Sequence, residues 1–164
     1  MGKLFNADEV FQIAVQMEDN AAAFYRRAAG NFADNAATAL LERLARMEDD
    51  HKKTFEEMRK AMAGPGAGAE QFDLYQEGGQ YLAAVASGYR VEGSPAIAES
   101  LSGEETLKDI VKIGLNLEKE SVLFYLGMKD VVPDELGKDR LDKIIAEEKS
   151  HIVTLSKELQ GVQE

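Results

Sequence analysis

The two histidines of this 164-residue chain lie in matching surroundings, each three residues after a glutamate. Glu48 and His51 stand in the segment EDDH, and Glu148 and His151 stand in EKSH. Residues three apart are neighbours on a helix, so each pair can present a carboxylate oxygen and an imidazole nitrogen to one metal ion. Mixed carboxylate and imidazole ligands suit iron or manganese. The two pairs therefore indicate metal chemistry, provided that helices carry them.

Two further glutamates accompany these pairs in an internal repeat with an offset of one hundred residues. Glu18 corresponds to Glu118, and Phe24-Tyr25 corresponds to Phe124-Tyr125. A lone glutamate in so acidic a chain is usually a solvated surface group, and a lone Glu-x-x-His can arise by chance. Five residues repeated in the same order at this offset make chance a poor explanation. We therefore predict six metal ligands: Glu18, Glu48, His51, Glu118, Glu148 and His151.

Electrostatics favours the same interpretation. Four carboxylates buried together repel one another and are costly to desolvate, whereas two divalent cations balance their charge. We predict two ions roughly 3.5–4 Å apart, with Glu18 and Glu118 in a position to bridge them. Tyr25 and Tyr125 lie seven residues after these glutamates, on the same helix faces. They are either plain core aromatics or groups whose hydroxyls hydrogen-bond a ligand carboxylate and support it.

Apolar residues at three- and four-residue spacing predict four long helices that carry these groups. The first spans 7–29, with Asn6 and Glu9 as its cap, and the second follows Asp34 and ends near residue 63. Ser102 with Glu105 predicts a capping box for the third helix, over about 103–129, and Pro133-Asp134 marks the start of the fourth, which ends near residue 159. The glycine-rich stretch 64–102 is predicted to hold one or two short helices, interrupted at Gly78-Gly79.

These elements predict an all-α fold, a ferritin-like four-helix bundle made of two repeated helical hairpins. We expect a single domain over residues 1–164. Hairpin one covers about 7–63, a long crossover between helices two and three covers about 64–102, and hairpin two covers about 103–160. In this arrangement the six predicted ligands point into the apolar seam of the bundle.

Composition and charge exclude several classes of function. A formal net charge of −11 argues against binding to nucleic acids and to anionic membranes. Charged residues interrupt every apolar run well short of a membrane span, and we expect no signal peptide. The absence of cysteine rules out disulfides and thiolate metal sites and fits a reducing compartment, so we expect a cytoplasmic protein.

With its two Glu-x-x-His motifs and the paired Glu18 and Glu118, the chain resembles the rubrerythrin-like branch of the ferritin-like superfamily. The resemblance implies a di-iron centre that reduces hydrogen peroxide or reacts with oxygen, and it suggests a homodimer. Rubrerythrins add a rubredoxin domain whose cysteines bind iron, but these 164 residues contain no cysteine. The resemblance therefore implies electrons from an external donor protein. Ser121 stands where many rubrerythrins carry a further glutamate ligand, which implies a more symmetric site.

Other functions stay open at this point. A ferroxidase or another iron-handling protein would use the same ligands. A manganese catalase would too, because this ligand set does not separate iron from manganese. A metal-free helical interaction module is an alternative of a different class. Among these, we expect a di-iron peroxidase that protects against oxidative stress.

Overall fold

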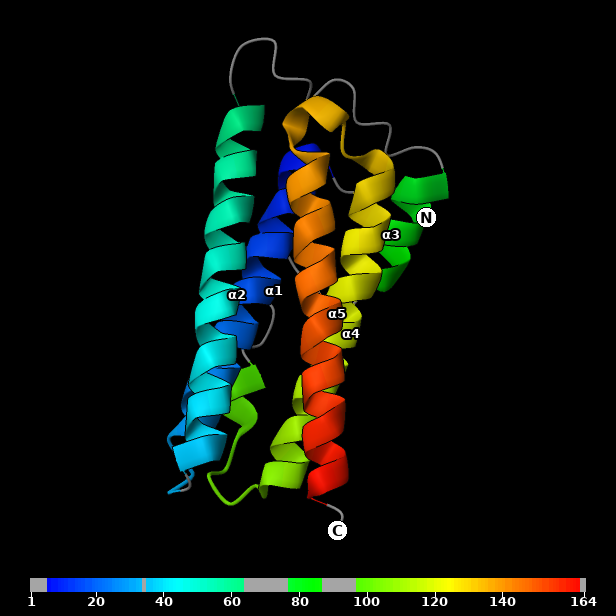
Figure 1. Ribbon diagram of the computed structural model, residues 1–164. Helices are drawn as coiled ribbons and strands as arrows, with labels where there is room; N and C mark the ends of the chain where they lie inside the picture. Colours follow the sequence, from blue (N-terminus) through cyan, green and yellow to red (C-terminus); the bar gives the residue numbers. More distant parts are fainter. Residues whose placement is uncertain (1–5, 34, 64–76, 87–96, 163–164) are drawn as a thin grey trace.

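Four long helices lie side by side in the computed structural model, which describes residues 6–33, 35–63, 77–86 and 97–162 (Figure 1). No β-strand occurs among these residues, so the predicted all-α class is confirmed. The long helices are α1 (Ala7–Ala29), α2 (Asn35–Met62), α4 (Leu107–Val131) and α5 (Lys138–Gly161). The short ones are α3 (Glu77–Val85) and the 3₁₀ helices η2 (Ile97–Ser100) and η3 (Asp134–Leu136).

The long helices form two hairpins. Helix α1 packs along α2 and α4 packs along α5, while α1 against α4 and α2 against α5 join the two hairpins. Helices α2 and α4 run in the same direction, so the chain has to pass along the bundle between them (Figure 1). This arrangement confirms the two predicted hairpins and the long crossover. Residues 64–76 and 87–96 of the crossover lie outside the described part of the chain.

Capping boxes set the starts of α1 and α4. The Asn6 side chain accepts a hydrogen bond from the Glu9 amide at 2.9 Å, as predicted, and Glu9 accepts one in return. The same reciprocal pair opens α4, but with Thr106 and Asp109 instead of Ser102 and Glu105. The predicted start of α4 was therefore wrong by four residues. Ser102 and Glu105 do hydrogen-bond, at 2.8 Å, but they close a turn that precedes the helix.

Glycine conformation explains two of these helix boundaries. Gly103 has a φ of +90°, a left-handed conformation that an α-helix cannot continue through, so α4 has to begin after it. Gly137 has a φ of +94° and likewise separates η3 from α5. The predicted fourth helix is therefore split, with its main segment beginning at Lys138 rather than at Pro133-Asp134.

Glycines also let α3 lie close against α4. Gly78 and Gly79 lie inside α3, so the prediction that they interrupt a helix was wrong. A Cβ atom at Gly78 would lie 3.0 Å from Cγ1 of Val131, and one at Gly127 would lie 2.9 Å from Cδ2 of Leu82. These glycines are used for close packing between two helices.

The core of the bundle consists of two apolar clusters with a polar layer between them. One cluster surrounds Phe11, Phe55 and Ile144, and the other surrounds Phe24, Leu44 and Leu155. On each long helix the chain passes from one cluster to the other through the predicted ligands. The bundle therefore holds these polar groups at one level, with apolar packing on both sides of them.

Candidate metal centre

All six predicted ligands lie together in this buried layer. Each is at most 3% exposed. Glu18 comes from α1 and Glu118 from α4, while the two Glu-x-x-His pairs come from α2 and α5. Buried carboxylates are rare unless they are paired or bind metal, so four of them beside two buried histidines at one level mark a functional site.

The ligand atoms form two groups of four. Glu18, Glu48, His51 and Glu148 offer four atoms that all lie within 4.8 Å of one another, and so do Glu48, Glu118, Glu148 and His151. Glu48 and Glu148 belong to both groups. The glutamates of the Glu-x-x-His motifs are therefore the ones that could reach two ions, whereas the sequence had suggested Glu18 and Glu118 for that position. Glu18 and Glu118 each serve one group only.

Both histidines turn the same nitrogen toward the carboxylates. Nδ1 of His51 lies 3.1 Å from Oε1 of Glu148 and 3.3 Å from Oε2 of Glu48. Nδ1 of His151 lies 3.1 Å from Oε1 of Glu48 and 3.2 Å from Oε2 of Glu148. The two rings stack at an angle of 21°, with centroids 5.9 Å apart. Nδ1 is therefore the nitrogen available to a metal ion, and Nε2 points away from the centre.

The two tyrosines hydrogen-bond carboxylates of the opposite hairpin. The Tyr25 hydroxyl donates to Oε1 of Glu118, and the Tyr125 hydroxyl donates to Oε1 of Glu18. Both tyrosines are fully buried, and burial raises the pKa of each well above its ordinary value, which keeps the hydroxyls protonated and able to donate. These bonds tie α1 to α4 across the bundle and orient the two glutamates that belong to one group each.

Burial and mutual contact divide the carboxyl groups into two kinds. Burial raises the pKa of Glu18 and of Glu118, and the negative charges of neighbouring glutamates raise it further. Burial acts in the same direction on Glu48 and Glu148, but their hydrogen bonds, chiefly with the histidines and neighbouring carboxyl groups, outweigh it and lower the pKa of each. The carboxyl groups placed to bridge are thus ionised, and the other two hold their protons more tightly.

The histidines supply the balancing charge in the protein without metal. Burial lowers the pKa of a histidine, but hydrogen bonds with buried glutamates raise the pKa of His151 to about 12. Contacts with Glu148, Glu18 and Glu48 likewise raise the pKa of His51. The protonated imidazoles therefore offset negative charge on the carboxylates beside them. Cations entering the cluster have to displace these protons.

The donor set fits a pair of metal ions. Three buried carboxylate oxygens in this layer lie near Nδ1 of a histidine, at 3.1–3.6 Å, but in none of the three does the geometry form a proper hydrogen bond: Oε2 of Glu18, Oε1 of Glu48 and Oε2 of Glu148. Buried oxygens that lack hydrogen bonds are costly unless another partner satisfies them. The three glutamates that carry them belong to the two ligand groups, so cations bound there would satisfy these oxygens.

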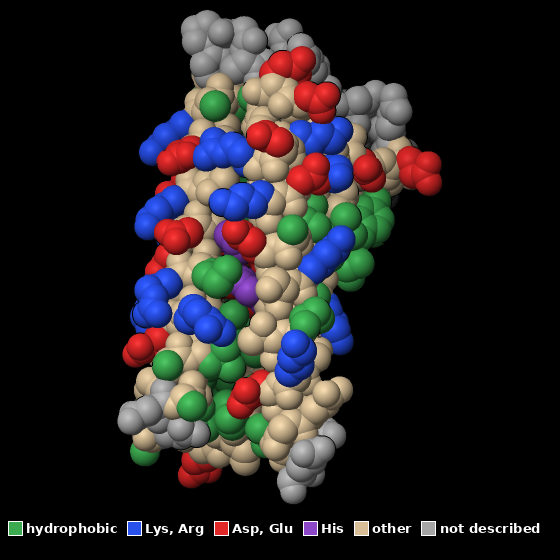
Figure 2. Space-filling model, viewed as in Figure 1, with side chains coloured by type: hydrophobic (Ala, Val, Ile, Leu, Met, Phe, Trp, Pro, Cys, Tyr) green, Lys and Arg blue, Asp and Glu red, His purple; other side chains and the backbone are tan. Residues whose placement is uncertain are grey.

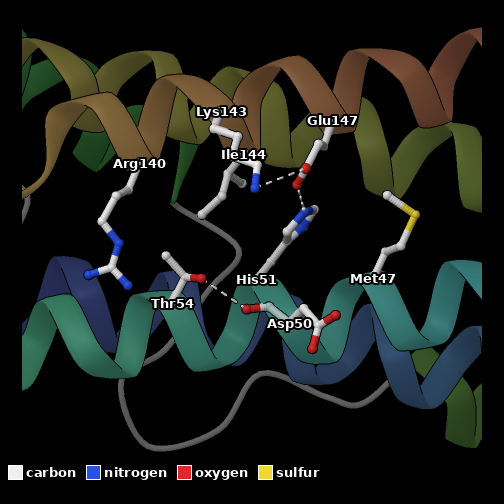
Figure 3. A pocket seen from close by; sticks show the side chains of 8 residues that line it. All are labelled: Met47, Asp50, His51, Thr54, Arg140, Lys143, Ile144 and Glu147. Carbon is white, nitrogen blue, oxygen red and sulfur yellow. Dashed lines mark hydrogen bonds and ion pairs between the residues drawn. The ribbon is translucent and has the colours of Figure 1, made fainter.

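A pocket reaches one edge of the centre from outside. Figure 2 shows the histidines on the face between α2 and α5, at the bottom of a narrow gap. The pocket beside His51 has a volume of about 360 Å³ and is lined by residues from both helices, among them Met47, Thr54, Arg140 and Glu147 (Figure 3). Small molecules can therefore reach the outer edge of the His51 ring.

Two functional contacts were missed at the sequence level. Nε2 of His51 lies 2.8 Å from Oε2 of Glu147, and Nε2 of His151 lies 3.3 Å from Sδ of Met47. Met47 and Glu147 correspond to each other in the repeat, since each precedes the glutamate of a Glu-x-x-His motif. Their equivalent positions in the repeat could have indicated that both contact a histidine. A methionine and a glutamate are so different chemically that the sequence gave no reason to expect the same role for them.

Comparison with solved structures identifies the fold. A crystal structure from Thermotoga maritima, described as that of a candidate ferritin-like diiron-carboxylate protein, superposes with a TM-score of 0.72 and covers 98% of both chains. This chain has the ferritin-like fold. The two sequences are 20% identical, so the likeness concerns the fold alone. No family model and no curated protein sequence matches the chain. None of the described helices is long and apolar enough to cross a membrane.

Proposed function

We propose that the protein is a di-iron carboxylate oxidoreductase that reduces hydrogen peroxide or reacts with oxygen. The observation that carries this proposal is the pair of four-ligand groups that share Glu48 and Glu148 in a buried layer. Carboxylate and imidazole donors suit iron with open coordination positions. The structural neighbour from Thermotoga maritima, described as a candidate diiron-carboxylate protein, supports the same metal.

The chemistry of peroxide reduction matches a pair of redox ions. A pair of ferrous ions held by Glu18, Glu48, His51, Glu118, Glu148 and His151 would supply the two electrons that convert hydrogen peroxide and two protons into two molecules of water. The sequence contains no cysteine that could hold a rubredoxin-type iron. We propose that an external redox donor protein returns the electrons after each cycle.

The residues around the centre position the ligands and control solvent. Tyr25 and Tyr125 fix the orientation of Glu118 and Glu18. Apolar clusters above and below the ligand layer exclude bulk water, which strengthens the electrostatic interactions within it. The pocket between α2 and α5 provides access on one side, at His51. A small, uncharged oxidant such as hydrogen peroxide suits so narrow an approach.

Rapid mixing tests the proposed activity. Anaerobic protein loaded with ferrous iron is mixed with hydrogen peroxide, and oxidation is followed by absorbance. We expect the bound iron to be oxidised faster than free ferrous iron, with one peroxide consumed per pair of ions. Glu48→Ala, which removes one shared ligand, should lose this fast phase. Oxidation no faster than that of free iron would contradict the peroxidase proposal.

Two other results would indicate a catalase or a ferroxidase instead of a peroxidase. Evolution of oxygen from peroxide by manganese-loaded protein, without any reductant, would indicate a catalase. Fast oxidation by oxygen followed by release of ferric iron would indicate a ferroxidase that handles iron as its substrate. Sustained turnover with a reduced donor is the outcome that the peroxidase proposal predicts.

A further inference from the structure

The two histidines differ in what lies behind them. In each ring Nδ1 faces the carboxylates, so Nε2 is free to contact groups outside the ligand layer. Behind His51 that group is the carboxylate of Glu147, with Oε2 at 2.8 Å from Nε2. Behind His151 it is the thioether of Met47, with Sδ at 3.3 Å. The two partners occupy equivalent places in the repeat but have unlike chemistry.

The carboxylate is a stronger hydrogen-bond acceptor than the thioether. A ring that binds a metal ion through Nδ1 carries its proton on Nε2 and donates it outward. An ionised acceptor makes a shorter and stronger bond, whereas a thioether sulfur is a weak acceptor. A carboxylate behind a ligating histidine fixes the orientation of the ring and raises the basicity of the ligating nitrogen. His51 has this support and His151 does not.

The carboxylate of Glu147 is held between a lysine and the His51 ring. Its side chain is about one-third exposed, with a relative accessibility of 34%, and it lies between Lys143 and His51 (Figure 3). Nζ of Lys143 lies 3.9 Å from Oε1, and Oε2 is the oxygen that faces the ring. Glu147 belongs to neither ligand group.

We infer that Glu147 makes the two metal positions unequal. The position formed by Glu18, Glu48, His51 and Glu148 binds its ion more tightly and fills first. The position formed by Glu48, Glu118, Glu148 and His151, with Met47 behind its histidine, binds the second ion more weakly and exchanges it more readily. Glu147 acts here as a positioning residue, through His51. This inference rests on the proposed dinuclear centre and adds an order of loading to it.

Calorimetric titration of the metal-free protein with cobalt(II) tests the inference, because it measures binding without any turnover. The native protein should bind two ions in two resolved steps. Glu147→Gln should weaken the tighter step by roughly 10–100-fold, as the loss of such outer hydrogen bonds typically does, and should leave the weaker step in place. Met47→Glu, which puts a carboxylate behind His151, should tighten the weaker step and bring the two steps together.

Matched variants separate this effect from a general loss of charge or of one ligand. Glu42→Gln removes one negative charge from an exposed position on α2 and should change neither step. His151→Ala should leave the tighter step and His51→Ala the weaker one, which assigns each step to its position. Thermal unfolding of each metal-free variant, followed by circular dichroism, confirms that it is folded before titration.

The possible results are distinct. Two equal steps in the native protein, or an equal shift of both steps in Glu147→Gln, would overturn the inference while leaving the dinuclear centre intact. No change in Glu147→Gln would also overturn it. Failure of the folded native protein to bind any cobalt would contradict the proposed function and this inference together.

Discussion

The first hairpin, residues 7–62, and the second, residues 107–161, build the centre from equivalent parts. The capping boxes at their starts, at Asn6 and at Thr106, are themselves one hundred residues apart. In both hairpins a tyrosine hydroxyl reaches a glutamate of the other hairpin. The hairpins differ at the outer edge, where Met47 stands opposite Glu147 in the repeat. The two copies thus share the groups that face the centre and differ in the groups behind them.

Removal of a shared ligand should have the largest effect. Glu48→Ala and Glu148→Ala each take an atom from both ligand groups, so we expect both to abolish binding of the metal pair. Glu18→Ala and Glu118→Ala affect one group each and should leave one ion bound. Metal content after anaerobic loading and gel filtration measures this. One ion retained by Glu48→Ala would show that it does not bridge.

Metal affinity should rise with pH, because metal binding has to remove protons from groups in both hairpins. The pKa values of Glu18, Glu118 and both histidines are raised in the metal-free protein, so these groups keep their protons to a higher pH than they would in water. Metal binding has to displace those protons, and a higher pH lowers the cost of removing them. A pH indicator in weakly buffered solution measures their release. An affinity that does not change between pH 6 and 8 would contradict this account.

Loss of either tyrosine hydroxyl should destabilise the metal-free fold to a similar extent. Tyr25→Phe and Tyr125→Phe each leave a buried carboxyl oxygen without its donor, at a cost of about 1–3 kcal/mol. Urea unfolding measures the change in the free energy of unfolding. A loss found in one variant and absent from the other would break the equivalence of the two hairpins.

The capping boxes should give the smallest effect. Asn6→Ala and Thr106→Ala should each reduce the free energy of unfolding by about 1 kcal/mol, because each removes an N-cap. Ser102→Ala lies outside the helix and should cost less. Urea unfolding of the three variants ranks them. An effect of Ser102→Ala larger than that of Thr106→Ala would return the start of α4 to the originally predicted position.

Periodicity and the repeat were enough to predict the four helices and the clustering of the six polar residues. Glu18 and Glu118 share a helix face with buried residues. Helical spacing of this kind can be recognised directly in the sequence, and it predicts which side chains face the core. The start of α4 was missed because Ser102 with Glu105 satisfies the same pattern as Thr106 with Asp109. The repeat would have selected Thr106, since Asn6 lies one hundred residues before it.

The spacing of the ligands in the sequence could not predict which glutamates belong to both ligand groups and which belong to one. Spacing places Glu48 on a face of α2, but the atoms that its carboxylate reaches depend on side-chain torsions and on how closely α2 and α5 approach. The contact of Glu147 with His51 depends on the same approach, since the two residues come from different helices. The glycines in α3 were misread because Gly78 serves packing against α4, a role that local sequence does not reveal.

The central claim is that the buried layer holds two ions between the two hairpins. A crystal structure of iron-loaded protein, with an anomalous difference map at the iron edge, tests it directly. We predict two peaks roughly 3.5–4 Å apart, both contacted by Glu48 and Glu148, with Nδ1 of His51 on one and Nδ1 of His151 on the other. A single peak, or iron bound only outside the six-ligand layer, would contradict it.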